Sequence, residues 1–349
     1  MAKLKTLSER LRDNDFPDPA PWKTHEEVAA AYDEGFPGAF PDPEGDEELA
    51  ATKYGDGEKT LREFGLEGAG AGKLTCLWPA VWRVAGNENI FQGSVSQPVG
   101  DCVSRSQAFA ATLSLAVACE NGKGSWPELK TEHAKLMGFH PHGTYGLRGY
   151  TGHGWSCSTA ALKSKQIGLV EFGHYGPPAN VDLTSYGSKT STIFGSRGPS
   201  SEAITQLGTH RTVDYTVLKG FEQVRDALAS GYGVSSCGGE GFSKTRNSIG
   251  VSKRSGHWSH AFCYIGVDDS PWAHKNGGPF IACLNSWGTR WISGPRATQG
   301  NPSLPPLPMG AWWATWSDVS RRSTFGMTTV QGFPSMKLKP WSQAIGGLV

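Results

Sequence analysis

The sequence lacks a long apolar run, a secretory signal and a large net charge, and each absence excludes a class of protein. No uninterrupted apolar run approaches the ~18 residues that a membrane-spanning helix needs, so no transmembrane segment is expected. The opening stretch, MAKLKTLSERLRDNDFPDP, has basic side chains but no apolar stretch behind them, so no secretory signal is expected. The formal net charge is only +1, which gives no reason to expect a nucleic-acid partner. These absences predict a globular protein without membrane or nucleic-acid partners.

Paired metal-binding cysteines are missing as well. The seven cysteines include no C-x-x-C pair, which argues against a zinc ribbon and is compatible with a reduced compartment or with one reactive thiol beside optional disulfides. His257, His260 and Cys263 form an H-x-x-H-x-x-C pattern. Residues three apart on a strand point to opposite faces, so this pattern is a poor zinc site. The sequence predicts no metal and no cofactor.

Acidic side chains are concentrated at the start of the chain. Residues 1–75 hold 17 of the 32 acidic and 9 of the 33 basic residues, so they carry about −8 and the remainder about +9. The segment is rich in Pro, Asp and Gly, with short helical patterns only at 24–31 and 58–64. It predicts an extended acidic arm over residues 1–73, either as a disordered tail or laid across the basic body.

A regular alternation of apolar and polar residues begins near Leu74 and predicts one folded domain over 74–325, followed by a tail over 326–349. Helical patterns come first and short strands bounded by Gly, Pro or Asp come later, which predicts an α+β domain in two lobes. The expected helices are 102–119, 158–165 and 221–229, and the expected strands are 259–267, 279–287 and 309–316.

Cys102 opens the first long helix of this domain, in the stretch QPVGDCVSRSQAFAATLSLAVACENG. Unpaired backbone N–H groups and the positive end of the helix dipole favour the thiolate form of a cysteine at this position. A thiolate nucleophile also needs a base, a group that orients the base, and donors for an oxyanion. His260, at the start of an apolar strand, and Asn285, at the end of the next one, are candidates for the first two.

These motifs resemble those of the papain-like cysteine proteases. NSWGT, from Asn285, is similar to the family's asparagine motif, SHAF, around His260, to its histidine strand, and GDCVS, around Cys102, to its nucleophile motif. The chain order Cys, His, Asn also agrees. The variant Gln-x-x-Gly-Asp-Cys-Val-Ser looks like papain-like proteins encoded by tailed phages. The resemblance implies a papain-like two-lobed α+β fold, with a helical lobe headed by the nucleophile helix and an antiparallel lobe carrying His and Asn.

The resemblance also implies a role for each site residue. Cys102 is the nucleophile, His260 the acid and base, Asn285 the group that orients the imidazole, and Trp287 the cover of that hydrogen bond. Gln97 is the expected oxyanion donor together with the Cys102 N–H, and Gln92, in FQGS, is the alternative. Gly154 stands where the family's substrate-binding glycines stand.

The sequence also departs from the family pattern. Val103 replaces the tryptophan that follows the nucleophile, and Val99 stands where a structural disulfide cysteine is expected. The family's helical prodomain is not recognisable in residues 1–75. The sequence also contains a basic loop, which comprises Lys244, Arg246, Lys253 and Arg254. This loop is expected to be exposed to solvent or, alternatively, to bind the acidic arm.

Two function classes follow. The first is a cysteine peptidase acting on polypeptides, and the alternative is a papain-fold structural or assembly component, for example of a phage virion. The missing signal and prodomain keep the alternative open and predict a cytoplasmic or virion-associated protein. The arm is expected to run over the catalytic domain or onto a neighbouring subunit. Of these two hypotheses, assembly with other subunits is favoured.

Overall fold

The computed structural model of the chain describes residues 25–34, 38–40, 67–93, 95–122, 126, 128–148, 153–187, 203, 206 and 212–330. The helical pattern expected at 58–64 lies outside these residues. The helices within them are α2 (His25–Asp33), α4 (Trp78–Ala85), α5 (Cys102–Glu120), α6 (Glu132–Met137), α7 (His142–Tyr145), η1 (Gly146–Arg148), α8 (Cys157–Ile167), α11 (Gly220–Ala229), α12 (Pro271–Lys275) and α13 (Trp316–Val319).

The strands fall into one large sheet and three short pairs. The large sheet consists of β2 (Leu74–Cys76), β8 (Thr212–Leu218), β9 (Val234–Phe242), β10 (Arg254–Asp268), β11 (Phe280–Leu284), β12 (Ala311–Thr315) and β13 (Ser323–Val330). The pairs are β1 (Ala39–Phe40) with β4 (Trp155–Ser156), β3 (Phe139–His140) with β5 (Val170–Glu171), and β6 (His174–Tyr175) with β7 (Val181–Asp182). All pairings in the large sheet are antiparallel.

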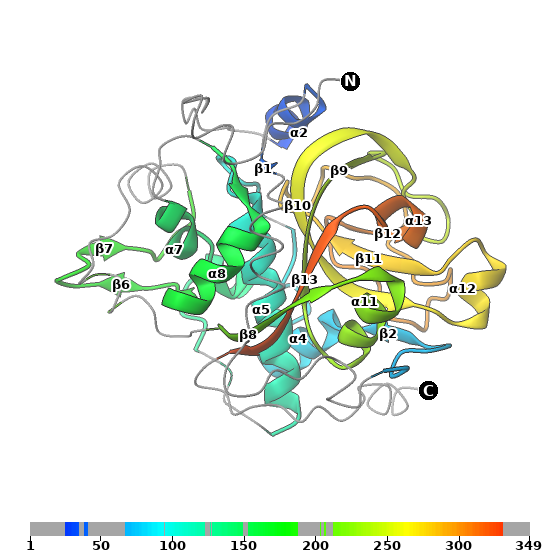
Figure 1. Cartoon of the computed structure of the whole chain (residues 1–349), viewed down its shortest axis with the longest axis horizontal. Coiled ribbons are helices and arrows are strands. Elements are labelled where there is room, and N and C mark those ends of the chain that lie inside the picture. Colours follow the sequence, from blue (N-terminus) through cyan, green and yellow to red (C-terminus); the bar gives the residue numbers. More distant parts are fainter. Residues whose placement is uncertain are drawn as a thin grey trace.

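The fold is α+β in two lobes, as the sequence predicts. Figure 1 shows α5, α7 and α8 on one side and the sheet of β9 to β12 on the other, with α5 running down the boundary. The strand order is β12-β11-β10-β9-β13-β8, and β2 pairs with β10. Because β10 and β11 pair antiparallel, with Cys263 opposite Leu284, the middle of β10 and the end of β11 lie together. His260 lies in the middle of β10, which begins at Arg254 and not at the expected residue 259, and Asn285 directly follows β11.

The helix α5 is the core element against which both lobes pack. Every residue from Cys102 to Ala118 is buried, and most side chains are alanine, serine or another small or apolar group. By length and composition this helix could cross a membrane, but 94% of the stretch is buried inside the protein, which is typical of a core helix. It ends at Glu120, and Gly122 follows at φ +69°, close to the expected end.

Tryptophan is abundant because an aromatic cluster fills the sheet lobe behind the site. The rings of Trp258 and Trp287 lie 4.6 Å apart, and those of Trp291 and Trp312 lie 5.1 Å apart. The ring of Phe262 lies 5.0 Å from that of Trp312, and it lies 6.1 Å from that of His260, which is two residues earlier on β10. The cluster gives the strand that carries His260 a rigid, dry support.

The acidic arm contributes three described pieces, which are 25–34, 38–40 and 67–73. The helix α2 matches the helical pattern expected at 24–31, and it buries Val28, Ala29 and Tyr32 on one face. Figure 1 shows α2 at the top, where the two lobes meet, with β1 directly below it. The described part of the arm therefore packs on the catalytic domain, and its expected contact with a neighbouring subunit stays a prediction.

One disulfide joins the lobes. Cys157, at the start of α8, is bonded to Cys237 in β9, and their Cα atoms lie 6.2 Å apart. The sequence did not predict this pairing, because 80 residues separate the two cysteines and neither belongs to a motif. Cys263 and Cys283 lie on the adjacent strands β10 and β11, and both thiols are free and buried.

Candidate active site

Cys102 begins α5 and is fully buried. Its sulfur accepts hydrogen bonds from the Tyr32 hydroxyl and from the Ala261 N–H on β10. The helix N-terminus favours a thiolate, but burial outweighs this and raises the pKa of Cys102 to about 12. In this conformation the thiol is therefore neutral at physiological pH.

His260 and Asn285 form the hydrogen bond that the motifs predict. His260 Nε2 lies 2.7 Å from Asn285 Oδ1, and both residues are fully buried. Because the amide oxygen can only accept, Nε2 carries the proton and Nδ1 is left as the basic nitrogen, buried without a hydrogen-bond partner. Burial lowers the pKa of His260 to about 3; the bond to Asn285 opposes this shift and the charge of Arg322 adds to it. The imidazole is thus neutral, like the thiol.

Trp287 shields this hydrogen bond. Its ring is fully buried, and its centroid lies 4.7 Å from that of His260. The ring of Trp258 packs edge-on against Trp287, with centres 4.6 Å apart, and lies 6.2 Å from the ring of His260. An apolar cover of this kind keeps water from competing for the Asn285 oxygen.

The two candidate glutamines lie in different places. Gln97 is fully buried, its side-chain nitrogen donates to the Tyr32 hydroxyl at 3.1 Å and to Val99 O at 2.8 Å, and its oxygen accepts from Ser286 Oγ. Gln92 instead donates to Glu88 O at 2.8 Å and accepts from the Met309 N–H. The structure therefore brings Gln97, and not Gln92, to the hydroxyl group that also contacts Cys102.

Gly154 forms part of the helical-lobe wall beside the nucleophile loop. It adopts φ +84°, which favours glycine, and its N–H donates to Gly100 O at 3.0 Å. Arg148 Nη1 donates to Gly154 O at 3.0 Å. These bonds fix the loop that leads into β4, although residue 152 of the predicted glycine motif lies outside the described residues.

Tyr32 is the site residue that sequence reasoning missed. It is fully buried, and its ring lies 4.6 Å from that of His260 and 5.0 Å from that of Trp287. Burial raises the pKa of its hydroxyl well above the ordinary value, so the group stays protonated. The only sequence signal was the short helical pattern at 24–31, which says nothing of the surface that the helix covers.

The arm continues across the cleft after α2. The strand β1 pairs in parallel with β4, where Trp155 N donates to Gly38 O at 3.1 Å. On the sheet-lobe side, Gly38 N donates to Ser259 O at 2.8 Å. One short segment is thus hydrogen-bonded to both lobes beside the candidate nucleophile.

Gly38 fits this position because it has no side chain. A Cβ atom at this residue would lie 2.1 Å from the Tyr32 hydroxyl oxygen and 2.7 Å from Ser259 O. The close approach of the three backbone segments therefore depends on glycine.

The basic loop also meets the arm. Asp33, the last residue of α2, accepts from Lys244 Nζ at 2.9 Å and from Trp258 Nε1 at 3.0 Å. Arg246 of the same loop instead donates to the backbone oxygens of Ala311 and Gly294. An ion pair between Lys244 and Asp33 therefore joins the basic loop to the acidic arm.

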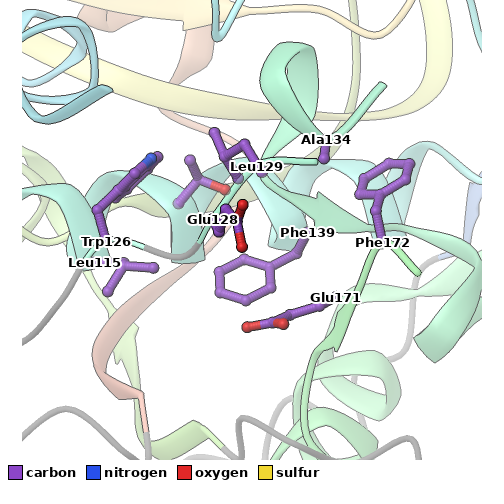
Figure 2. A pocket seen from close by; sticks show the side chains of 10 residues that line it. Leu115, Trp126, Glu128, Leu129, Ala134, Phe139, Glu171 and Phe172 are labelled. Atoms are coloured by element: carbon purple, nitrogen blue, oxygen red, sulfur yellow. The ribbon is translucent and has the colours of Figure 1, made fainter. Parts of the chain in front are cut away.

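Two other features lie apart from this site. Within the part of the chain that the structure describes, no group of His, Cys, Asp and Glu side chains is placed to bind a metal ion. A small pocket opens beside α5 at Thr112 and Leu115, about three turns from Cys102. Figure 2 shows Trp126, Phe139 and Phe172 around it. It has no contact with the candidate nucleophile.

No protein-family model matches this sequence, and no curated protein matches it either. Among solved structures, the chain is similar to xylellain, a cysteine protease from Xylella fastidiosa, with 13% identity and a TM-score of 0.47 over 81% of this chain and 97% of that one. It is also similar to digestive procathepsin L 3 of the Tenebrio molitor larval midgut, with 14% identity and a TM-score of 0.44 over 91% and 86%. The proform of the ragweed pollen cysteine protease Amb a 11 matches with 13% identity and a TM-score of 0.45 over 88% and 78%. Similarity at this level assigns no role to any residue.

Proposed function

We propose that this protein is a papain-like cysteine peptidase that hydrolyses peptide bonds in polypeptide substrates. The observation that carries the proposal is the bond of 2.7 Å between His260 Nε2 and Asn285 Oδ1, which leaves Nδ1 as the basic nitrogen. His260 directly precedes Ala261, the residue on β10 whose N–H donates to Cys102. A thiol at a helix start and a correctly protonated imidazole are the two groups that acyl transfer to sulfur needs.

In the proposed reaction, His260 Nδ1 takes the proton of the Cys102 thiol, and the sulfur forms a bond to the carbonyl carbon of the substrate. The Gln97 side-chain nitrogen and the Cys102 N–H donate to the oxygen that becomes negative. The C–N bond then breaks, the amine leaves with the proton from His260, and an acyl-thioester remains. Water, deprotonated by His260, hydrolyses this thioester and restores the thiol.

The proposal includes a latent state. The Tyr32 hydroxyl accepts from Gln97 and donates to Cys102, so it occupies the place where a substrate carbonyl would bind. Neutral Cys102 and neutral His260 are the consequence of burial beneath the arm. Residues 25–34 and 38–40 must therefore leave the site before turnover, and solvent must enter.

The alternative, a structural or assembly component with the same fold, is favoured by one observation. A fully buried thiol whose pKa is about 12 is unreactive, which is expected of a protein that catalyses no reaction. Assembly with other subunits through the arm belongs to this alternative.

The experiment uses the full chain, a Tyr32→Ala variant and a Tyr32→Ala/Cys102→Ala double variant. Each is treated with iodoacetamide, and alkylation of the five free cysteines is followed by peptide mass. An unfolded protein is then offered as substrate. The peptidase proposal expects selective alkylation of Cys102 and cleavage of the substrate in Tyr32→Ala, both lost in the double variant. Alkylation of Cys102 without cleavage would favour the structural component instead.

A further inference from the structure

A second group of buried polar side chains adjoins the candidate nucleophile. Asp101 directly precedes Cys102, and its Oδ2 accepts from the Tyr186 hydroxyl at 2.6 Å and from His142 Nε2 at 3.0 Å. Asp101 and His142 are fully buried, and Tyr186 is 5% exposed. None of the three belongs to the Cys–His–Asn set. Asp101 is part of the GDCVS motif but has no role assigned from it, and His142 and Tyr186 lie outside the sequence motifs.

These bonds connect three separate parts of the helical lobe. Tyr186 lies 85 residues from Asp101 along the chain, and His142 lies 41 residues away. The network continues outward, because the His142 N–H donates to His140 Nδ1 at 3.2 Å and His140 Nε2 meets Ser185 O at 3.1 Å. The carboxylate of Asp101 is therefore the inner end of a chain of bonds that reaches the outer loops.

Asp101 does not behave as an ordinary helix cap. It occupies the N-cap position of α5, where an aspartate usually accepts from the backbone N–H groups of the first turn. Here the side chain makes no such bond and is directed to His142 and Tyr186 instead. The bonds that hold Asp101 thus hold the entry of α5, and with it the Cys102 N–H.

Charge argues against a role in activating the thiol. A carboxylate beside Cys102 opposes thiolate formation, and Asp101 is one of the causes that raise the pKa of this thiol. The other titratable or charged groups that act on the thiol are Tyr32 from α2 and Arg322 beside β13. Because Asp101 disfavours the thiolate form of Cys102, its role is better explained by the residues that it holds in position.

We propose that Asp101 is a positioning residue, held by His142 and Tyr186, that fixes the first turn of α5 so that the Cys102 thiol and N–H face the cleft. The inference rests on the proposed function where it concerns turnover. Arg105, one turn further along α5, supports the same arrangement, because its guanidinium carbon lies 5.0 Å from the centre of the Tyr186 ring.

The test compares Asp101→Asn with Asp101→Ala in the full chain that also carries Tyr32→Ala. The asparagine oxygen can still accept from Tyr186 and His142, but it carries no charge, whereas alanine removes the bonds as well. Alkylation of Cys102 by iodoacetamide is measured across pH. The pH at which the alkylation rate is half its maximum reports the ionisation of the Cys102 thiol, and this pH is called the midpoint. The maximal rate at high pH, called the plateau, reports the orientation of the thiolate. Where the parent hydrolyses peptides, kcat and KM are measured too.

Both variants are expected to move the alkylation midpoint to lower pH by a similar amount, because both remove the negative charge. Only Asp101→Ala is expected to lower the plateau and kcat, by about tenfold or more, with KM nearly unchanged. Tyr186→Phe keeps the charge and removes one bond. It should lower the plateau and kcat without moving the midpoint to lower pH.

Equal plateaus in Asp101→Ala and Asp101→Asn would overturn the positioning role, and an unmoved midpoint in both would show that Asp101 does not act on the thiol. A parent that is alkylated but hydrolyses nothing would refute the proposed function. The midpoint and the plateau would still decide the role of Asp101. Melting temperatures of all variants separate these effects from loss of fold.

Discussion

The hydroxyl group of Tyr32 lies 3.1 Å from the side-chain nitrogen of Gln97 and donates a hydrogen bond to the sulfur of Cys102. A residue of the acidic arm therefore contacts both the candidate nucleophile and the candidate oxyanion donor. Seventy residues of chain separate Tyr32 from Cys102. Any substrate carbonyl that used these two groups would have to displace this hydroxyl.

Replacing Tyr32 should expose the thiol. With a pKa of about 12, roughly one Cys102 thiol in 10⁴ is ionised at pH 8, whereas an ordinary cysteine is roughly one-quarter ionised there. Tyr32→Ala should therefore raise the rate of Cys102 alkylation at pH 8 by at least about tenfold. Tyr32→Phe keeps the buried ring but removes the hydrogen bond that lowers the pKa of the Cys102 thiol, so its alkylation rate should not rise. Equal rates in the three proteins would contradict an arm that blocks the site.

Opening the site should move two pKa values in opposite directions. Burial raises the pKa of Cys102 to about 12 and lowers that of His260 to about 3, because water stabilises both charged forms and is excluded here. In Tyr32→Ala the pKa of the thiol should fall and that of the imidazole should rise. The imidazole then becomes protonated at a higher pH than in the intact chain. NMR titration of His260 measures this, and an unchanged value in the variant would show that the arm does not exclude water.

The sequence predicted the fold class and the elements that carry the site because local patterns encode them. Cys102 at a helix start and the neighbouring strands with His260 and Asn285 all follow from apolar periodicity and motif order. Tyr32 and the Cys157–Cys237 disulfide could not be predicted, because both depend on contacts between segments that are remote in the chain. The packing of α2 on the catalytic domain depends on the same kind of contact.

The two glutamines should differ in their effect on rate. Gln97→Ala removes a donor that lies beside Cys102, so acylation in the Tyr32→Ala background should slow by roughly 10² to 10³. Gln92→Ala is the matched control, since its side chain bonds to Glu88 and Met309 instead. Single-turnover rates distinguish the two variants. A larger loss in Gln92→Ala would assign the oxyanion site to the upstream glutamine.

Salt should loosen the arm only slightly. Lys244 and Asp33 are about half exposed, and an exposed pair of this kind contributes about 0.2–1 kcal/mol. At about 1 M ionic strength, where the Debye length is about 3 Å, alkylation of Cys102 in the intact chain should rise by a few fold at most. Asp33→Asn should abolish this salt response, and Lys253→Gln, in the same loop, should leave it intact. A salt response that survives Asp33→Asn would show that other charges hold the arm.

Gly38 offers a way to displace the arm without changing any residue of the candidate active site. An added Cβ atom would lie 2.1 Å from the Tyr32 hydroxyl oxygen and 2.7 Å from the backbone oxygen of Ser259. Since Ser259 belongs to the rigid strand β10, the arm is the part that must move. Gly38→Ala should therefore raise Cys102 alkylation in the same direction as Tyr32→Ala.

The matched control is Gly187→Ala, where an added Cβ atom meets nothing within 4 Å. Its alkylation rate should equal that of the unaltered chain. A Gly38→Ala protein with unchanged reactivity would mean that the cleft accommodates a side chain at this point. The block would then rest on Tyr32 alone. If Gly38→Ala also failed to alter the oligomeric mass while raising reactivity, the arm would act on the cleft and not in assembly.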